Sequence, residues 1–108
     1  MNPAPSALNS HVLVLNKMWM AIRVVEARKA FAMLVREMAE VIRVDDGSYT
    51  GHPFGDWAEL SAARAKYEAS EHSGGESSQY EWVRTVRMPL AVPKIIRLLN
   101  YDRVPRSG

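Results

Sequence analysis

Cysteine is absent from this chain of 108 residues. Its absence excludes disulfide bonds, thiolate zinc sites and cysteine nucleophiles, and it is typical of a cytoplasmic protein. Long apolar runs are missing too, because runs such as 12–15 fall far below the roughly 18 residues that a membrane-spanning helix needs. We therefore expect a cytoplasmic protein with no membrane segment, built as one domain around one core.

Histidine is scarce, since the chain has only His11, His52 and His72. Their separations of 41 and 20 residues match no zinc-finger spacing, so we predict no metal ion and no cofactor within this chain. His52 lies near Asp56, but an isolated histidine of this kind is usually a turn residue with a local hydrogen bond. A free-standing enzyme based on His52 and Asp56 is therefore only a minor alternative.

Charge is distributed unevenly, although the net charge is only +2. Residues 1–36 carry a net charge of +4, residues 37–81 a net charge of −7, and residues 82–108 a net charge of +5. Ten of the fourteen cations are arginine, whose planar guanidinium suits phosphate and carboxylate groups better than lysine does. The chain is not a uniform polycation, so any contact with nucleic acid should involve its basic ends.

The first half of the chain contains the clearest helix signal. Residues 1–10 have the composition of a mobile leader. The apolar run 11–16 predicts a central strand buried on both faces, and 17–25 predicts a loop that leads into a short strand or directly into a helix. Apolar residues at helical spacing then predict a helix over 26–38. No serine, threonine, aspartate or asparagine stands at its natural N-cap position.

The second half predicts shorter elements. Residues 40–44 favour a strand, and the Asp-Asp-Gly sequence at 45–47 favours a tight turn, not a cation site, into a second strand. Asp56 is placed to cap a helix that fades into the loop-like segment 70–79. Residues 82–88 favour an edge strand, and 94–100 favour a final helix. The predicted fold is a small single α+β domain, with a short mixed or antiparallel sheet packed against two or three helices.

Three tryptophans, Trp19, Trp57 and Trp82, are available as core residues or as a stacking platform. The chain has only two phenylalanines, and a small domain needs large apolar side chains in its core. We therefore predict that the tryptophans pack inside.

The order of several motifs resembles a known family. VLVLNK at 12–17, EARKAFAML at 26–34, AEVI at 39–42, GHPFGDWAELS at 51–61 and MPLAVPKIIRLLNYDRVPR at 88–106 follow one another as in the N-terminal region of a bacterial family of HNH endonucleases. Many relatives have a glycine where this chain has Glu37. We expect the helix before it to lack a left-handed cap and to continue into Met38.

The resemblance implies that this domain is followed by a separate nuclease module that carries the catalytic residues. In the family, a basic segment, a Cys-x-x-Cys pair and the His-Asn-His motif follow the position of Arg106. Residues 107–108 would then be the end at which such a module begins. We expect no catalytic residue in this chain, and a divalent metal only in that module, where the complete protein would be a DNA hydrolase.

The expected role of domain 11–106 is therefore that of a non-catalytic accessory domain that helps to position DNA. Its expected partners are DNA, bound weakly, and the nuclease module. The basic and aromatic residues of the last segment are the candidates for phosphate contacts and base stacking. These candidates are Arg84, Arg87, Lys94, Arg97, Tyr101, Arg103 and Arg106.

The alternative is a stand-alone module for protein interaction or oligomerisation, without a role in nucleic-acid binding. Its acidic middle or its basic C-terminal segment would then dock a protein partner, or the domain would pair with a second copy of itself. The candidate cations could also form an ordinary solvated surface without a binding role.

Overall fold

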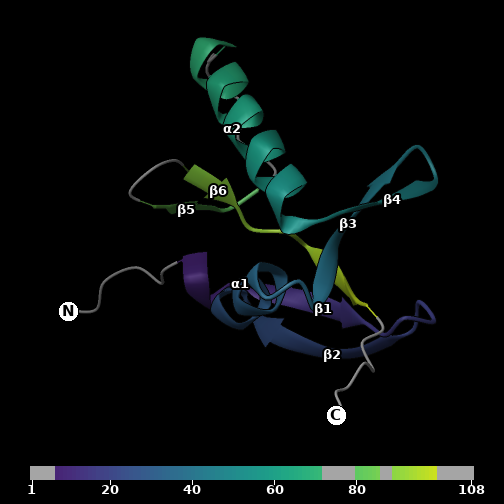
Figure 1. The fold of residues 1–108 in the computed structure, drawn as a ribbon. Coiled ribbons are helices and arrows are strands. Elements are labelled where there is room, and N and C mark those ends of the chain that lie inside the picture. The colour runs from purple at the N-terminus through teal and green to yellow at the C-terminus, as the bar shows by residue number, and fades with distance from the viewer. Residues whose placement is uncertain (1–6, 72–79, 86–88, 100–108) are drawn as a thin grey trace.

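The structure is a computed structural model that describes residues 7–71, 80–85 and 89–99. Helices and strands occupy most of this part of the chain (Figure 1). In order, they are η1 (Ala7–Asn9), β1 (His11–Leu15), β2 (Ala21–Glu26), α1 (Ala27–Val35), β3 (Ala39–Asp45), β4 (Ser48–His52), α2 (Phe54–Glu71), β5 (Trp82–Arg84), β6 (Pro89–Ala91) and β7 (Ile95–Leu98).

Five strands form one mixed sheet in the order β2-β1-β7-β3-β4. The pair β1–β7 is parallel, and the other three pairs are antiparallel. Strands β5 and β6 form a separate two-stranded sheet. Together with the two helices α1 and α2, this arrangement confirms the predicted α+β class with a small mixed sheet.

The core lies on one face of the five-stranded sheet. Val14, Ile96 and Val41 are aligned across β1, β7 and β3, and each has an exposed fraction of 1% or less. Helix α1 covers this face with Ala30 and Leu34, which belong to the same cluster. The spacing of small and apolar residues along α1 therefore decides which face of the sheet is buried.

The opposite face of the sheet is more open toward its edges. Val24 pairs with Leu13, and Val44 pairs with Tyr49. The exposed fractions are 56% for Val24, 50% for Val44 and 63% for Tyr49. Strand β1 accordingly has two neighbours, as predicted, but it is fully buried on one face only, and the prediction of burial on both faces is wrong.

Helix α2 extends away from the five-stranded sheet, and the β5–β6 hairpin lies beside it (Figure 1). Two hydrogen bonds join them: Trp57 Nε1 donates to the carbonyl of Ala91 at 2.7 Å, and the amide of Ala91 donates to Ser61 Oγ at 3.1 Å. Trp57 and Ser61 are buried. The amide of Trp57 donates to Pro53 O, so α2 begins before Asp56, which lies in the first turn and is not the cap.

Helix α1 ends earlier than predicted, at Val35. Glu37 adopts φ of 63°, and its amide donates to Leu34 O while the amide of Met38 donates to Met33 O. These two bonds form a Schellman motif with glutamate at the left-handed position that glycine usually occupies. The prediction that α1 lacks a left-handed cap and continues into Met38 is therefore wrong.

The largest error concerns the predicted helix over 94–100. Residues Ile95–Leu98 form strand β7, which is inserted between β1 and β3. Two β-branched isoleucines favour a strand, and partners on both sides satisfy the backbone of β7. A segment this short carries too few turns for apolar spacing to distinguish helix from strand.

The segment 17–25 follows the first of its two predicted alternatives, because a turn leads into the short strand β2. Two smaller differences from the predicted elements remain. Of the strand expected over 82–88, β5 covers Trp82–Arg84, and residues 86–88 lie outside the described residues. Its partner β6 begins at Pro89. Residues 7–10 of the expected leader are packed, because the amide of Ala27 donates to Ser10 O at 2.7 Å.

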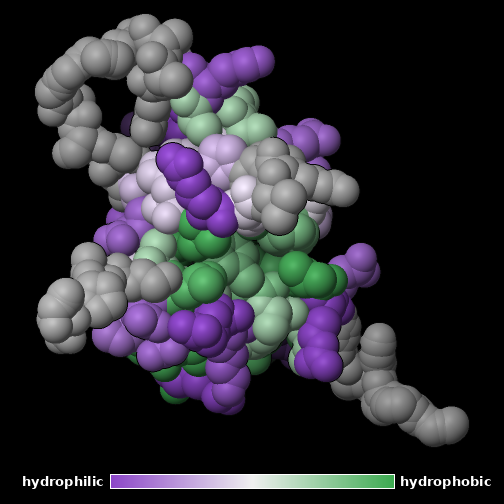
Figure 2. Space-filling view, turned by 90° about the vertical axis from the view of Figure 1, so that its left-hand side faces the viewer, coloured by the Kyte–Doolittle hydropathy of each residue, from purple (hydrophilic) through white to green (hydrophobic). Residues whose placement is uncertain are grey.

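The tryptophans do not share one environment. Trp57 is 3% exposed, which confirms the core prediction, and Trp82 is partly buried against the core. Trp19 is 45% exposed, so the prediction is wrong for this residue. Figure 2 shows apolar residues in a band across one face of the molecule, with hydrophilic residues above and below.

Candidate functional site

The structure describes only some of the predicted nucleic-acid contacts. Arg84 at the end of β5 is exposed, and so is Lys94 directly before β7. Arg97 lies within β7 and is partly buried. The other four candidates lie outside the described residues: Arg87, Tyr101, Arg103 and Arg106.

Arg97 is held tightly by groups of its own chain. It lies opposite Glu40 in the β3–β7 pair, and its Nη1 donates to Glu40 Oε2 at 3.0 Å. Its Nε and Nη2 donate to the carbonyl of Lys17 at 3.3 and 2.9 Å. Both side chains of the ion pair are 21% exposed. This arginine joins β7, β3 and the turn between β1 and β2, and its donors already have acceptors.

An aromatic pair lies beside Arg97, at the tips of two hairpins. The guanidinium carbon of Arg97 is 4.5 Å from the centre of the Trp19 ring, and the ring centres of Trp19 and Tyr49 are 5.8 Å apart. Trp19 has φ of 70°, a conformation that the Asn16 side chain supports by accepting hydrogen bonds from the amides of Met18 and Met20. We call Trp19, Tyr49, Arg97 and Glu40 the sheet-tip cluster.

A second group of cations surrounds Tyr80 on the other side of the molecule. The Arg64 guanidinium carbon lies 6.0 Å from the centre of the Tyr80 ring, and Lys94 Nζ lies 5.6 Å from it. These residues come from α2 and from the link between β6 and β7. The Tyr80 ring also meets the edge of Trp57, with ring centres 5.7 Å apart. Tyr80 therefore brings two cations of distant sequence origin together.

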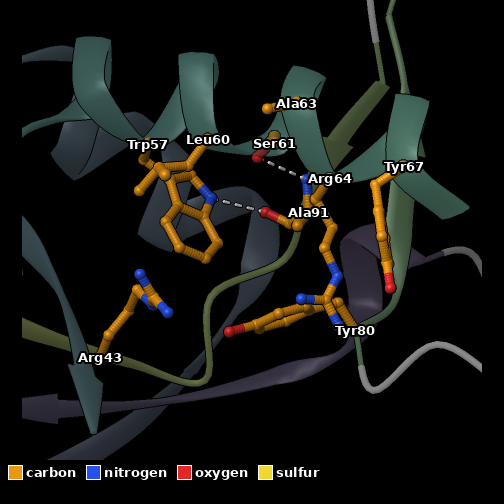
Figure 3. A pocket seen from close by; sticks show the side chains of 9 residues that line it. All are labelled: Arg43, Trp57, Leu60, Ser61, Ala63, Arg64, Tyr67, Tyr80 and Ala91. Atoms are coloured by element: carbon orange, nitrogen blue, oxygen red, sulfur yellow. Dashed lines mark hydrogen bonds between the residues drawn. The ribbon is translucent and has the colours of Figure 1, made fainter. Parts of the chain in front are cut away.

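Next to Tyr80 there is a cavity of about 260 Å³. Arg43 of β3 and Arg64 of α2 reach it from different sides, and the Tyr80 ring lies below the Arg64 guanidinium (Figure 3). The remaining lining is mainly apolar and aromatic. It consists of Trp57, Leu60, Ser61, Ala63, Tyr67 and Ala91. We call this cavity and its lining the Tyr80 pocket.

The remaining candidates for chemistry do not assemble into a site. His52 Nε2 lies 3.3 Å from Thr50 Oγ1, a local contact of the expected kind. Asp45 pairs with Arg43 at 3.1 Å, and Asp46 and Gly47 have the positive φ values of the predicted tight turn. Within residues 7–71, 80–85 and 89–99, no three histidine or carboxylate side chains are grouped as metal ligands. In the same residues, no helix is long and apolar enough to cross a membrane.

Sequence reasoning missed most of the residues that build these two sites. Arg43, Arg64 and Tyr80 carried no motif, because they come from three segments that are far apart in the sequence. Glu40 could be linked to Arg97 only by knowing that β3 and β7 are neighbours. One local signal existed, since Asn16 after an apolar run is a residue that organises turns.

Comparison with known proteins gives one family. A family model described as the HNH endonuclease-associated N-terminal domain matches residues 12–106. Searches of curated proteins and of solved structures found no match.

Proposed function

The chain belongs to the family of HNH endonuclease-associated N-terminal domains. We propose that it serves an HNH nuclease module as a non-catalytic domain that holds DNA by its phosphates. The module would supply the metal-dependent cleavage, and this domain would add affinity and orientation. The family supports an association with such an enzyme, and contact with DNA is the step that we add.

The observation that carries this proposal is the placement of cations around Tyr80. Arg64 and Lys94 both approach this ring, and Arg43 lies across the adjoining pocket. Three cations from separate segments thus border one surface region, and Arg84 is exposed on the β5–β6 hairpin beside α2. Phosphate contacts are made by cations that reach the surface, and they carry no sequence information themselves. We expect little contribution from Arg97, because its donors are engaged by Glu40 and Lys17 O.

Duplex binding at two salt concentrations tests the proposal. We expect weak, sequence-tolerant binding to a fluorescent 20-base-pair duplex, measured by anisotropy, that falls steeply between about 50 and 200 mM salt. The double variant Arg84→Ala/Lys94→Ala should weaken binding and lower the salt slope by about 1 to 2, because each lost phosphate contact lowers it by about 1. Arg103→Ala/Arg106→Ala tests the C-terminal candidates in the same way.

The matched control is Arg28→Ala/Lys29→Ala, which removes the same charge from the exposed side of α1. The proposal is wrong if the wild-type domain shows no binding at low salt. It is also wrong if the control weakens binding as much as Arg84→Ala/Lys94→Ala, because attraction would then follow net charge alone.

A second candidate function, self-association, is favoured by the uncovered edges of the sheet. Trp19, Val44 and Tyr49 expose apolar surface close together, and exposed apolar patches of several hundred Å² mark interaction sites. A second copy of the chain would bury this surface. Light scattering during size-exclusion chromatography measures the molar mass and so tests this candidate. A wild-type dimer that Tyr49→Asp converts to a monomer would favour self-association.

A further inference from the structure

We infer that the Tyr80 pocket binds one nucleotide, with its base among the aromatic side chains and its phosphate between Arg43 and Arg64. This inference deepens the proposed function, since it assigns a single nucleotide unit to a domain that we place on DNA. A free nucleotide and a nucleotide within a single strand share this chemistry. The experiments below distinguish these two sources.

The size and lining of the pocket favour a planar ligand. A volume of about 260 Å³ is just below the usual range of roughly 300–1,000 Å³ for sites that enclose a drug-sized ligand. The base would therefore enter, while sugar and phosphate stay at the mouth. Trp57, Tyr67 and Tyr80 supply three aromatic rings, and base–aromatic stacking is the common way in which proteins hold unpaired bases.

The charges at the pocket favour an anion. Arg43 and Arg64 both line the cavity, and Lys94 lies on the Tyr80 ring that they border. Asp45 is one carboxylate close to the pocket, and its Oδ2 lies 3.1 Å from Arg43 Nη2. The Asp45 side chain is 60% exposed and that of Arg43 is 33% exposed, so water screens this ion pair. A phosphate group brings more negative charge than a carboxylate does and can engage two guanidinium groups at once.

Hydrogen bonds and a ring contact hold the aromatic walls of the pocket in place. The Trp57 indole is fixed by its hydrogen bond to Ala91 O, and Ser61 Oγ holds the amide of the same residue (Figure 3). The edge-to-face contact between Trp57 and Tyr80 then positions the Tyr80 ring. Prior positioning of the walls lowers the entropy lost when a ligand binds.

Nuclear magnetic resonance of the tryptophan indole groups provides a direct test. Each indole N–H gives one signal, and a Trp57→Phe variant identifies the signal of Trp57. We expect addition of 5′-dAMP to shift the Trp57 signal in a saturable way. The Trp19 signal should not move, because Trp19 contacts Tyr49 and Arg97 on the opposite face of the sheet.

Three further probes identify which part of the nucleotide is recognised. Deoxyadenosine, which lacks the phosphate, should bind at least tenfold more weakly than 5′-dAMP, and inorganic phosphate should compete at least tenfold less well. A single-stranded oligonucleotide of ten thymidines distinguishes the sources. Binding of 5′-dAMP alone assigns the pocket to a free nucleotide, and a Trp57 shift with the oligonucleotide assigns it to a DNA strand.

Two substitutions on one helix connect binding to the pocket. Arg64→Gln should weaken 5′-dAMP binding at least tenfold, because it removes a charge-assisted hydrogen bond. Lys66→Gln removes the same charge from an exposed position of α2 outside the pocket and should change binding less than twofold. Tyr80→Phe should retain binding, whereas Tyr80→Leu should weaken it about tenfold by removing the stacking ring.

Several results would overturn the inference. One is no saturable Trp57 shift with either 5′-dAMP or the oligonucleotide. Another is equal competition by inorganic phosphate, which would indicate a simple anion site. A third is an equal effect of Lys66→Gln and Arg64→Gln. If duplex binding persists while the pocket fails, only this inference is wrong, and if the pocket binds while duplex binding is absent, only the proposed function is wrong.

Discussion

Arg97 and Arg64 each lie over an aromatic ring, yet their surroundings differ. Arg97 lies 4.5 Å from the centre of Trp19, and its other donors reach Glu40 and the carbonyl of Lys17. Arg64 lies 6.0 Å from the centre of Tyr80 and borders a cavity. An arginine placed within a sheet acts as a structural link, whereas one at the edge of a cavity has space beside it for a ligand.

Loss of Arg97 should have the largest effect on stability. Arg97→Ala leaves the carboxylate of Glu40 and the carbonyl of Lys17 without their charged donor, because all three hydrogen bonds of the guanidinium and its cation–π contact are lost. We expect the free energy of unfolding to fall by about 2 kcal/mol, measured by urea denaturation.

The matched control for Arg97→Ala is Arg23→Ala, which removes an exposed arginine from β2. It should lower the free energy of unfolding by less than about 0.5 kcal/mol. Equal losses in the two variants would show that Arg97 does not hold the strands together.

Gly51→Ala should have the next largest effect. A Cβ at this position would lie 2.6 Å from the Cδ of Glu40, which Arg97 holds in place. We expect a loss of about 1 kcal/mol, measured by urea denaturation.

The cost of Gly51→Ala should shrink when Arg97→Ala is already present, because the Glu40 side chain can then move away. Gly55→Ala is the control, since a Cβ there meets no atom within 4 Å. An unchanged cost of Gly51→Ala in the double variant would contradict the prediction.

Glu37→Gly should raise the stability slightly. Glu37 has φ of 63°, a conformation that glycine adopts without the steric cost of a side chain. We expect the free energy of unfolding to rise by about 0.5 kcal/mol, measured by urea denaturation. Glu59→Gly, within α2, should instead lower it by about 1 kcal/mol, and a decrease in both variants would disprove the strain at Glu37.

The smallest effect on stability should come from Arg64→Gln. Because glutamine keeps part of the aliphatic stem and a polar end group, the substitution should change the free energy of unfolding by less than about 0.5 kcal/mol, measured in the same urea series. A loss as large as that of Arg97→Ala would remove the distinction between the two arginines.

The sequence predicted those elements whose signal is local. The β3–β4 hairpin followed from the Asp-Gly turn, and α1 followed from its apolar spacing. Predictions failed where neighbours decide the structure. β7 is a strand because β1 and β3 accept it between them, and Trp19 is exposed because the turn after Asn16 places it at a hairpin tip.

The candidate sites show the same division. The sequence identified basic residues near its C-terminal end, including Lys94 and Arg97, but it could not separate a linking arginine from one beside a cavity. That difference depends on Glu40 and Lys17 for Arg97, and on Tyr80 for Arg64 and Lys94. Each of these contacts joins residues that are distant in the sequence.

The sequence by itself determined the family, the α+β class and the local turns, because order of motifs, periodicity and turn chemistry are properties of neighbouring residues. Only the tertiary structure decided the strand order, the role of Arg97 and the existence of the Tyr80 pocket. The physical reason is that a cavity, or an ion pair between strands, forms where segments distant in the sequence come into contact. Which segments come into contact depends on the packing of the whole chain.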